Sequence, residues 1–460
     1  MISFRKIDKS DLPRIRPYFT PSSRICTKAI GVMYMWSKYC GTEVAFYDGG
    51  VLLKDDWSGV PVFRVPQGER AQEGFALLEA YVRETGDELV FHSVDDEDLA
   101  RLSARYPAIE LKSHRDNADY LYLASDLAEY KGKKYHGQKN HRNKFLRDYP
   151  QYEFLPFDKD DLPQIYAFLE EHKALCPRTK GELIEYDSCF RLLDAMDALD
   201  LLTAMIRVDG KIVAISVGEM LGDTLIIHVE KALPAYGGVY PTICSLFAAR
   251  YGKNATYINR EDDSGDEGLR VSKTQYHPIA LLDKRLAFCR FSRPLPLETI
   301  FTDRLVIDAI SERDLTQYAA LATDDERNRF WGYDYKEDLG SDEPNAAHFA
   351  RVLAEDEARG VCYSRKIADY TGAFVGEGVI YNLRADGSAE LGLRIVRERA
   401  GCGYGREAYR ALSEAALKIL PRLHARCFKE NIQSKKMILA AGFSLVREEE
   451  EMLYFVKERA

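Results

Sequence analysis

Glu390-Leu-Gly-Leu-Arg-Ile-Val-Arg-Glu-Arg-Ala-Gly-Cys-Gly-Tyr-Gly-Arg-Glu-Ala-Tyr409 is the stretch that decides the fold. Its first residues alternate between apolar and other types, as in a strand with one buried face. Three glycines at alternate positions follow, namely Gly401, Gly403 and Gly405. Glycine lets the backbone approach a ligand closely, and the unpaired N–H groups of a following helix favour an anion. The stretch predicts a strand, a phosphate-binding turn and a helix, although an ordinary loop before a helix would look similar.

A second pattern downstream supports the phosphate-binding interpretation. Residues 425–443 show a short strand, Asn431, one helix and a Gly-Phe stop, and Thr302-Asp-Arg-Leu-Val-Ile307 and Glu312-Arg-Asp-Leu315 stand upstream. Together these motifs resemble the GNAT acetyltransferases, specifically the ribosomal-protein N-acetyltransferase branch. The resemblance covers residues 302–460 and implies a mixed sheet flanked by helices.

The resemblance implies acetyl-CoA as the cofactor. In that family the glycine turn binds the pyrophosphate, and the Asn lies along the pantetheine arm near the thioester. The residues that match these positions are Ile395, Val396, Ala400, Gly401, Cys402, Gly403, Tyr404, Gly405, Arg406 and Asn431.

Acid and base candidates are less well marked. Many relatives carry a Tyr on the helix after the Asn as the acid for the leaving thiolate, but Ile438 stands at the matching position here. Ser434 or a water is therefore the expected proton donor. Glu377 and Glu390 lie on predicted inward-facing strands and are candidate bases for the ammonium group of the acceptor.

Composition favours a globular cytoplasmic enzyme. The chain has 460 residues, 46% hydrophobic composition and a formal net charge of -9, which suits two or three domains and argues against non-specific nucleic-acid binding over the whole surface. The nine cysteines show no paired metal spacing, so we predict reduced thiols and no metal site. No apolar run approaches the roughly 20 residues that span a bilayer.

One start signal occurs three times, at Phe4–Pro13, Phe154–Pro163 and Leu305–Leu315. Each reads as a short strand that enters a capped helix. Asp8 with Asp11, Asp158 with Asp161 and Ser311 with Asp314 supply the caps. The Asp-Leu pairs begin at 11, 161 and 314, and this equal spacing predicts three small domains of one α/β (α+β) class. We therefore expect three GNAT-like modules, each a mixed central sheet flanked by helices.

The first module is predicted at residues 1–130. Its aromatic stretch Met33-Tyr-Met-Trp-Ser-Lys-Tyr39 is more typical of a core than of a substrate platform. No catalytic constellation stands out, so we expect a structural or substrate-shaping role.

Residues 130–147 carry seven lysines and arginines among aromatics and histidines. One interpretation is a helix face that binds the phosphates of RNA or of an anionic head group, with Lys133, Lys134 and Lys139 as contacts. The other is a solvated helix face. The two interpretations are equally supported.

The second module is predicted at residues 131–291. A strand, an Asp209-Gly210 hairpin turn and two further strands match the order expected of the third module. The stretch Glu230–Cys244, where the third module keeps its glycine turn, has Gly237 and Gly238 but no alternate glycines. Coenzyme A is therefore a poorer prediction for this module.

Residues 257–278 form the densest polar stretch of the chain. Asn259-Arg260-Glu261-Asp262-Asp263 and Gly268-Leu269-Arg270 with Lys273 resemble the C-terminal catalytic domain of phosphatidylglycerol lysyltransferase and uncharacterised bacterial proteins grouped with it, over residues 1–291. That family has two fused GNAT-like folds, and its best-known members move an aminoacyl group from a tRNA to a lipid. The resemblance implies Glu261, Asp262 and Arg270 as catalytic residues and Arg260 and Lys273 as substrate contacts. A salt-bridged turn that only closes the domain remains the alternative.

Prolines in Phe291–Glu298 predict a linker at residues 292–301, before a third module at 302–460. The preferred interpretation is an acyltransferase with an aminoacyl-transferase-like pair of modules and an acetyl-CoA-dependent N-acetyltransferase for a small-molecule or peptide amine. A tRNA or an anionic lipid head group would bind the pair. Two alternatives remain: the pair only binds a partner, or it delivers the acceptor amine to the third module.

Overall fold

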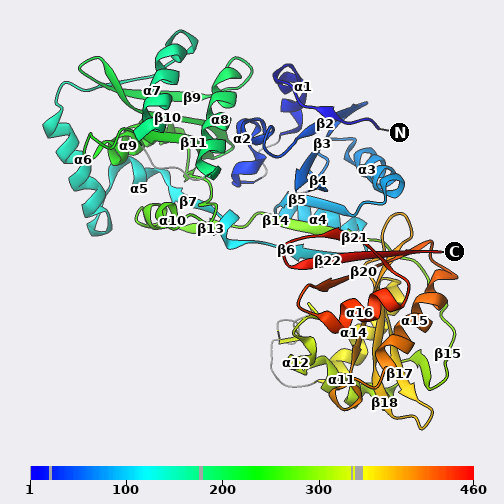
Figure 1. Cartoon of the computed structure of the whole chain (residues 1–460). Coiled ribbons are helices and arrows are strands. Elements are labelled where there is room, and N and C mark those ends of the chain that lie inside the picture. Colours follow the sequence, from blue (N-terminus) through cyan, green and yellow to red (C-terminus); the bar gives the residue numbers. More distant parts are fainter. Residues whose placement is uncertain are drawn as a thin grey trace. The chain divides into compact units, whose positions relative to one another are not determined.

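In a computed structural model, the chain forms three β-sheets flanked by helices, which confirms the predicted α/β class (Figure 1). The structure describes residues 2–19, 23–57, 59–175, 180–332, 335–336 and 345–459. Two compact units are present: unit 1 comprises residues 1–78, 90–102 and 110–288, and unit 2 comprises residues 79–89, 103–109 and 289–460.

The first sheet has the strand order β1-β2-β3-β4-β5-β14-β6. Its strands are β1 (Arg5–Lys6), β2 (Glu43–Tyr47), β3 (Gly50–Trp57), β4 (Val60–Phe63), β5 (Leu89–Val94), β14 (Arg285–Arg290) and β6 (Ala108–Lys112). The helices of this part are α1 (Leu12–Ile15), α2 (Ile30–Trp36), α3 (Ala71–Thr85) and α4 (Asp96–Arg105). Met33, Tyr34 and Met35 of α2 are buried, as the core interpretation of the aromatic stretch predicts, but Tyr39 at the end of this stretch is 64% exposed, so the interpretation is wrong there.

The second sheet has the order β13-β7-β12-β11-β10-β9-β8. Its strands are β13 (Ala280–Leu282), β7 (Asp119–Leu123), β12 (Tyr257–Asn259), β11 (Thr224–Ala232), β10 (Lys211–Leu221), β9 (Leu202–Val208) and β8 (Glu153–Leu155). The accompanying helices are α5 (Ala124–Glu129), α6 (His136–Asp148), α7 (Leu162–Leu175), α8 (Lys180–Asp194), α9 (Val239–Tyr251) and α10 (Glu267–Thr274). The predicted hairpin turn is confirmed, because Asp209 and Gly210 join β9 to β10 with positive φ.

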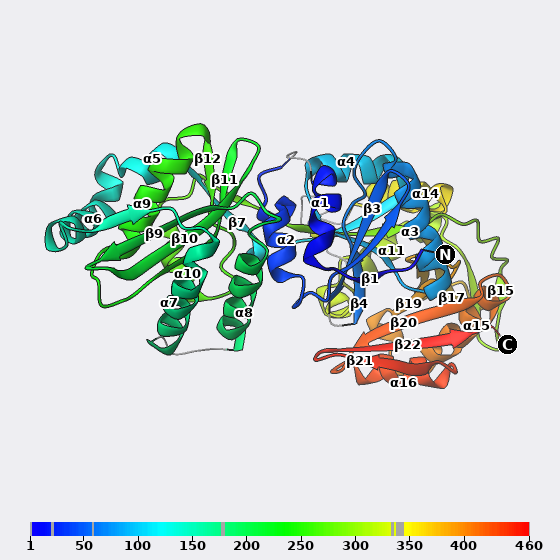
Figure 2. The same cartoon turned by 90° about the horizontal axis from the view of Figure 1, so that it is seen from above.

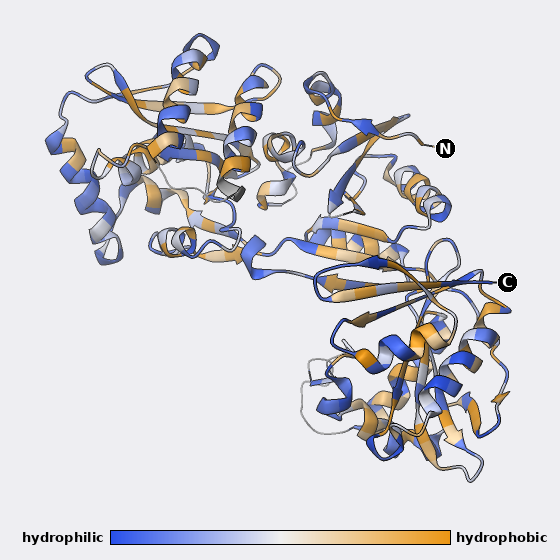
Figure 3. Cartoon of the chain, in the orientation of Figure 1, coloured by the Kyte–Doolittle hydropathy of each residue, from blue (hydrophilic) through white to orange (hydrophobic). Residues whose placement is uncertain are grey.

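Helices cover both faces of this second sheet, α5, α6 and α9 on one side and α7 and α8 on the other (Figure 2). Alternation along the strands explains this arrangement. Met205 and Ile215 pack with α7 and α8, whereas Ala204 and Ala214 pack with α5 and α9. Figure 3 shows α6 as largely hydrophilic, in keeping with its run of basic residues.

The third sheet has the order β15-β16-β17-β18-β19-β20-β22-β21. Its strands are β15 (Ile300–Phe301), β16 (Leu305–Ala309), β17 (Tyr363–Asp369), β18 (Phe374–Tyr381), β19 (Ala389–Ile395), β20 (Arg422–Phe428), β22 (Met452–Glu458) and β21 (Ser444–Glu448). The helices are α11 (Leu315–Ala322), α12 (Asp325–Asn328), α14 (Ala346–Arg359), α15 (Tyr404–Leu417) and α16 (Ile432–Ala440).

All three predicted helix starts are confirmed as capping boxes. The N-cap side chain accepts a backbone N–H three residues on, and the acid at that position accepts the N-cap amide. The pairs are Asp8 with Asp11, Asp158 with Asp161, and Ser311 with Asp314. These boxes satisfy amides that a helix start otherwise leaves unpaired.

Each sheet contains two neighbouring parallel strands that are paired over only part of their length. β4 pairs with β5 only at Phe63 and Phe91. The pairing of β11 with β12 ends at Ile226 and Asn259, although β11 runs on to residue 232. The pairing of β19 with β20 ends at Glu390 and His424, although β19 runs on to residue 395. Each module therefore has an opening in its sheet beyond the last paired residues, where the strands no longer hydrogen-bond to each other.

Candidate functional site

The glycine turn adopts the backbone conformation that its sequence predicts. Gly401 and Gly403 have φ of 78° and 84°, a region that favours glycine because a Cβ atom would be strained there. Gly403 is the N-cap of α15. The first amides of a helix have no carbonyl within the helix to bind, so the start of α15 can accept an anion such as a phosphate.

Arg304 holds this turn in place from β16's N-terminal side. Its Nη1 donates to the carbonyl of Cys402 at 3.0 Å, and its Nε donates to Glu407 at 2.7 Å. The guanidinium also lies 4.6 Å from the centre of the Tyr404 ring. The turn is thus preorganised by a side chain to which sequence reasoning gave no role, although its motif had been singled out.

Asn431 is the N-cap of α16. Its Oδ1 accepts the amide of Ser434 at 3.1 Å, so the structure brings these two predicted residues together. α16 packs against α15, since a Cβ at Gly405 would lie 3.4 Å from the sulfur of Met437. Ile438 is 1% exposed, so the position that carries a Tyr in many GNAT enzymes belongs to the core here.

The opening between β19 and β20 leads to the glycine turn. Val396, at the end of β19, donates its amide to the carbonyl of Val375 at 3.0 Å, on the β18 side. On the β20 side, residues 391–395 are not paired with a strand, because the parallel pairing of β19 with β20 stops at Glu390. An extended ligand arm can therefore lie along β19 on that side, with Ile395 and Val396 at the mouth.

Glu377 is buried in an ion pair. It is 1% exposed, and Arg394 donates its Nε to the Glu377 carboxylate at 2.8 Å. Arg394 is further held over the ring of Trp331 at 4.7 Å. Protonation of Glu377 would leave this buried guanidinium without its counter-charge.

Glu390 has a different environment. Tyr381 donates its hydroxyl to the carboxylate at 2.7 Å, Asn382 its amide at 3.1 Å, and Arg426 lies at 2.9 Å. Burial raises the pKa of Tyr381 well above its usual value, and the Glu390 charge raises it further. The Tyr381 hydroxyl therefore stays neutral, one hydrogen bond away from a carboxylate that is 3% exposed.

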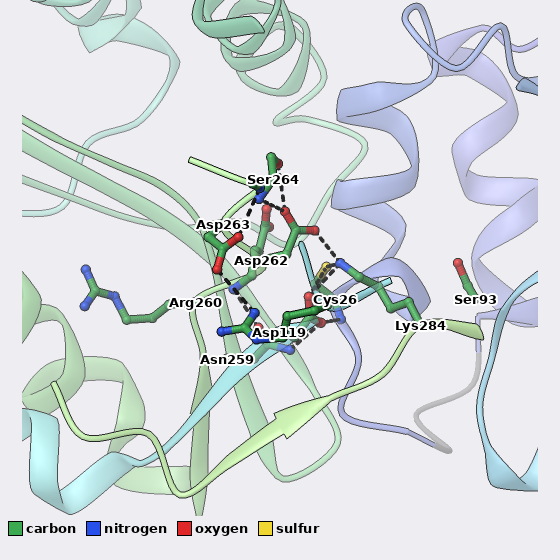
Figure 4. Close-up of polar contacts among 12 residues, drawn as sticks. Cys26, Ser93, Asp119, Asn259, Arg260, Asp262, Asp263, Ser264 and Lys284 are labelled. Carbon is green, nitrogen blue, oxygen red and sulfur yellow. Dashed lines mark hydrogen bonds and ion pairs between the residues drawn. The ribbon is translucent and has the colours of Figure 1, made fainter. Parts of the chain in front are cut away.

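In the second module, Asn259 locks the polar loop that follows β12 (Figure 4). Its Nδ2 donates to Asp119 at 2.8 Å and to the carbonyl of Arg24 at 2.7 Å, while its Oδ1 accepts the amide of Glu261 at 2.7 Å. Glu261 and Ser264 have positive φ, 58° and 48°. Such strain in residues other than glycine persists where surrounding contacts enforce it, often at functional sites.

Lys284 links Asp262 to Asp119 and also lies beside Cys26, as Figure 4 shows. Its Nζ lies 2.7 Å from Asp119 and 2.6 Å from Asp262, with the Cys26 sulfur at 3.5 Å. Burial alone lowers the pKa of Lys284, but Asp119 raises it well above its usual value, so the side chain is cationic. Asp119, Lys284 and Cys26 were missed by sequence reasoning, because each stands alone in an unremarkable stretch.

Arg270 is bound to Asp263, which is fully buried. Two of its nitrogens donate to that carboxylate at 3.0 and 2.9 Å, and Tyr120 donates its hydroxyl at 2.6 Å. Burial alone raises the pKa of Asp263, but these donors hold it well below its usual range. Arg270 also donates to Asp116 at 2.6 Å. The predicted catalytic Arg270 thus fixes the loop to α10.

Arg260 lies on the loop after β12, and Lys273 lies on α10. Lys273 donates its ammonium to the carbonyl of Arg260 at 2.7 Å and also to that of Asp262. Arg260 donates to Glu230 at 2.7 Å and lies 4.5 Å from the centre of the Tyr276 ring. The second oxygen of Glu230 and Nη1 of Arg260 are buried without a hydrogen-bond partner among the described residues. This ion pair therefore retains unused hydrogen-bonding capacity.

His228, on β11, completes the cluster. Its two ring nitrogens lie 3.0 Å from Glu261 and 3.0 Å from Glu219. Burial alone lowers the pKa of His228, but the two carboxylates raise it to about 9. Glu219 also accepts the amide of Gly31 at 2.7 Å, a contact with α2 of the first module. No pattern in the sequence links these residues.

The basic helix α6 starts beside the segment that follows α10. The carbonyl of Lys134 accepts from His277 at 2.8 Å, and Gln138 donates to the carbonyl of Gln275 at 2.7 Å. Lys133 and Lys139 are exposed, while Lys134 pairs with Asp126 at 2.9 Å. The predicted substrate-binding lysines therefore flank the chain segment that carries Arg270 and Lys273.

α6 also covers the start of α9, the second module's counterpart of the glycine turn. Gly238 caps α9 with φ of 89°. A Cβ at Gly238 would lie 2.0 Å from the carbonyl oxygen of His141 in α6. The backbone of α6 is therefore packed against the start of α9, whereas a Cβ at Gly401 in the third module's turn would meet no described atom within 4 Å.

Comparison with known proteins fits this organisation. Residues 22–288 match the family model of the phosphatidylglycerol lysyltransferase C-terminal domain, a match that spans more than half of the chain. The chain belongs to this family. Residues 304–444 match the GNAT acetyltransferase domain model. Both resemblances expected from the motifs are thus confirmed, the lysyltransferase-like part in the N-terminal region and the GNAT domain in the C-terminal region.

Two of the proteins similar to this lysyltransferase family member are described as uncharacterised or of unknown function. A Bacteroides thetaiotaomicron protein of unknown function is 30% identical, with a TM-score of 0.58, and the match covers 63% of this chain and all of that one. An uncharacterised Mycoplasmoides gallisepticum protein is 24% identical over 176 residues, 38% of this chain. The chain spans about half the length of that curated relative, 56%. Spermidine N-acetyltransferase from Vibrio cholerae, solved with CoA and spermine, is 14% identical over 34% of this chain and 97% of that one, with a TM-score of 0.31.

Two features are absent from the described residues. No helix among them is long and apolar enough to cross a membrane. Nor do they contain a group of three or more His, Cys, Asp or Glu side chains that could hold a metal ion.

Proposed function

We propose that the third module transfers an acetyl group from acetyl-CoA to an amine. The observation that carries this proposal is the opening between β19 and β20, which ends at a preorganised glycine turn. The match to the GNAT family model supports acyl-CoA as the donor class. The amides at the start of α15 would bind the pyrophosphate, and Asn431 would lie along the pantetheine arm.

The transfer requires one bond to form and one to break. The amine nitrogen attacks the thioester carbon, the carbon–sulfur bond breaks, and the thiolate takes a proton from Ser434 or from water. Of the two proposed bases, Glu390 is better supported than Glu377. Arg426, the cation beside Glu390, has a 36% exposed side chain and can be solvated, whereas Arg394 is buried and would lose the Glu377 charge that neutralises it.

Thiol release tests this proposal. The full chain is incubated with acetyl-CoA and a panel of polyamines and peptides with free N-termini, and free CoA is measured with a thiol reagent. We expect release with at least one amine and loss of release in Gly403→Glu. Release by wild-type and by Gly403→Glu at equal rates would contradict the proposed site.

For the N-terminal pair, we propose transfer of an aminoacyl group from a tRNA to an anionic lipid. Membership of the lysyltransferase family supports this reaction class. The exposed lysines of α6 beside α10 suit a phosphate-rich donor. Arg260 and Glu230 provide a buried polar pair with unused hydrogen-bonding atoms, and Glu261 is the proposed acceptor of the amine proton.

A second candidate is a binding module without turnover. The observation that favours it is that Arg270, Asp262 and Lys273 already bind protein groups at short distances. Such saturated ion pairs are typical of a structural loop.

An assay with charged tRNA separates the two candidates. Lysyl-tRNA labelled in the amino acid is incubated with the full chain and vesicles that contain phosphatidylglycerol, and lipid extracts are examined for label. Labelled lipid supports transfer. Retention of tRNA or vesicles without labelled lipid supports the binding module, and absence of both rejects both candidates.

A further inference from the structure

The first module contains a cavity that is separate from the polar cluster of the second module and from the glycine turn of the third. It encloses about 550 Å³ of empty space when the open solvent at its mouth is included. Its apolar lining comes from Tyr18, Phe19, Val51, Leu53 and Val65, and its polar lining from Lys28, Arg64, Gln67, His92 and Ser93.

The position of the cavity follows from the sheet topology. β4 and β5 are joined in parallel by the residue pair Phe63 and Phe91. Arg64 and Val65 come directly after Phe63, and His92 and Ser93 come directly after Phe91 on β5. The cavity therefore lies at the opening of the first sheet. In the third module, the corresponding opening is the one proposed to receive the acyl donor.

Arg64 is a half-buried cation whose Nε lies in the interior, and it has no anionic partner within salt-bridge distance among the described residues. Its Nη1 donates to the carbonyl of Thr27, but it forms no ion pair with any residue in the described ranges. Its Nε is buried and has no hydrogen-bond partner among them. Burial lowers the pKa of Arg64, and Asp55 partly offsets this. A buried charge is stabilised strongly by an anion that binds it directly.

The remaining charges at the cavity are already neutralised. Lys28 contacts Asp98 and lies 3.5 Å from Asp95. His92 stands between Ser93 Oγ, 3.0 Å from its Nδ1, and Asp55 Oδ2, 3.2 Å from its Nε2. Burial lowers the pKa of His92, so the imidazole is neutral at pH 7. No carboxylate of a described residue lines the cavity.

Ser93 is held in a strained backbone conformation. Its φ of 57° is uncommon for a residue other than glycine. The strain places the Ser93 hydroxyl at the cavity wall, where it donates to Nδ1 of the neutral His92 and keeps a lone pair free to accept. Figure 4 shows Ser93 on the first module, apart from the hydrogen bonds that link Lys284 to Asp119 and Asp262.

We propose that this cavity binds a small monocarboxylate with an apolar body, with the Arg64 guanidinium as the partner of the carboxylate. One unpaired cation matches one negative charge, and the absence of lining carboxylates disfavours an amine. The aromatic and aliphatic walls suit an acyl chain or an aromatic ring. The Gln67 amide donates one N–H to Asp98 and has a second N–H that can orient the acid group. The site is separate from the glycine turn of the third module.

Calorimetry on the full chain tests the proposal, with octanoate and phenylacetate as probes and octanol and octylamine as neutral and cationic counterparts. We expect at least one acid to bind with a Kd below about 1 mM and about tenfold more tightly than its counterparts. Arg64→Gln is expected to weaken the acid by about tenfold, and Arg64→Lys by less, because the charge remains. Val51→Phe is expected to weaken it by partly filling the cavity.

Two variants serve as controls. Arg24→Gln removes an exposed arginine of the same module that pairs with Asp223, and it should leave the affinity unchanged. Gly403→Glu alters the proposed acyl-CoA site and should also leave it unchanged, which separates this cavity from the third module. The proposal is overturned if neither acid binds at millimolar concentration. It is equally overturned if octylamine binds as well as octanoate, or if folded Arg64→Lys and Val51→Phe proteins both bind as wild type.

Discussion

His228 Nδ1 lies 3.0 Å from Oε1 of Glu261, so the carboxylate predicted to act in the N-terminal pair has an imidazole partner. His228 comes from β11 and Glu261 from the loop after β12, the two strands that part beyond Asn259. The contact therefore spans the opening of the second sheet. Because Glu219 flanks the other ring nitrogen, the imidazole carries a proton at neutral pH and holds Glu261 as its counter-ion.

This proton makes stability depend on pH. The pKa of His228 is about 9 in the folded chain, against roughly 6.5 in an unfolded one. A raised pKa stabilises the fold fully below the unfolded value, and this contribution is lost as the pH rises through about 9. We expect the denaturant midpoint to fall between pH 6.5 and 9 and His228→Gln to flatten this dependence. Urea unfolding at three pH values measures it, with exposed His136→Gln as the control that should keep the wild-type slope.

The glycine turn predicts a loss of cofactor binding in Gly403→Glu. This change adds a negative charge at the helix start and a side chain at φ of 84°, so we expect the affinity for acetyl-CoA to fall at least about tenfold, or about 1.4 kcal/mol. Gly372→Glu is the matched control, because Gly372 has φ of 83° in the turn between β17 and β18. Calorimetry that gives equal affinities for the two variants would remove the turn from the site.

Lys284 predicts a large effect on stability. Lys284→Met leaves Asp119 and Asp262 near each other without their cation, and removal of one partner of a buried ion pair costs about 3–5 kcal/mol. We expect a loss of this size in the free energy of unfolding. Lys38→Met breaks an exposed pair with Asp187 and should cost at most about 1 kcal/mol. Similar denaturant midpoints for both variants would contradict the account of the cluster.

The lysines in α6 and in the turn just before it predict a salt-sensitive contribution to ligand binding. Replacing Lys133, Lys134 and Lys139 by Gln should leave the melting temperature nearly unchanged, because these side chains are exposed. Affinity for tRNA should fall, and its dependence on salt should become shallower by up to about three charges. The charge-matched control replaces Lys9, Lys38 and Lys159, which are exposed elsewhere in unit 1. An equal loss in the control would show that only net charge matters.

Adding Arg270→Ala to the variant with the three lysine replacements distinguishes a working site from a structural loop. Asp263 would keep its hydrogen bonds from Tyr120 and from the amide of Gly265. If the loop serves ligand binding, we expect the additional variant to bind tRNA or anionic vesicles more weakly while it stays folded. Unfolding of Arg270→Ala, measured by circular dichroism, would instead show that the ion pair is structural.

Local features were readable from the sequence. The capping boxes at Asp8, Asp158 and Ser311 involve residues three positions apart, and the glycine turn depends on φ values that neighbouring residues hardly influence. Equal spacing of the helix starts gave the repeated module, and strand alternation gave the faces of the sheets. The same locality explains why Asn259, Glu261 and Asp262 could be grouped, since they are adjacent in the chain.

Partners distant in sequence required the tertiary structure. Asp119 and Lys284 are 165 residues apart, and their contact depends on how β7 and the segment before β14 meet. His228 and Arg64 gave no signal, because a single His or Arg on a strand has the same local pattern whether it is solvated, paired or buried. Sequence determined the modules, the turns and the residue types at each strand end. Only the tertiary structure decided which charges meet and that half-buried Arg64 has no counter-ion among the described residues, because burial and pairing arise from segments that fold together from far apart in the chain.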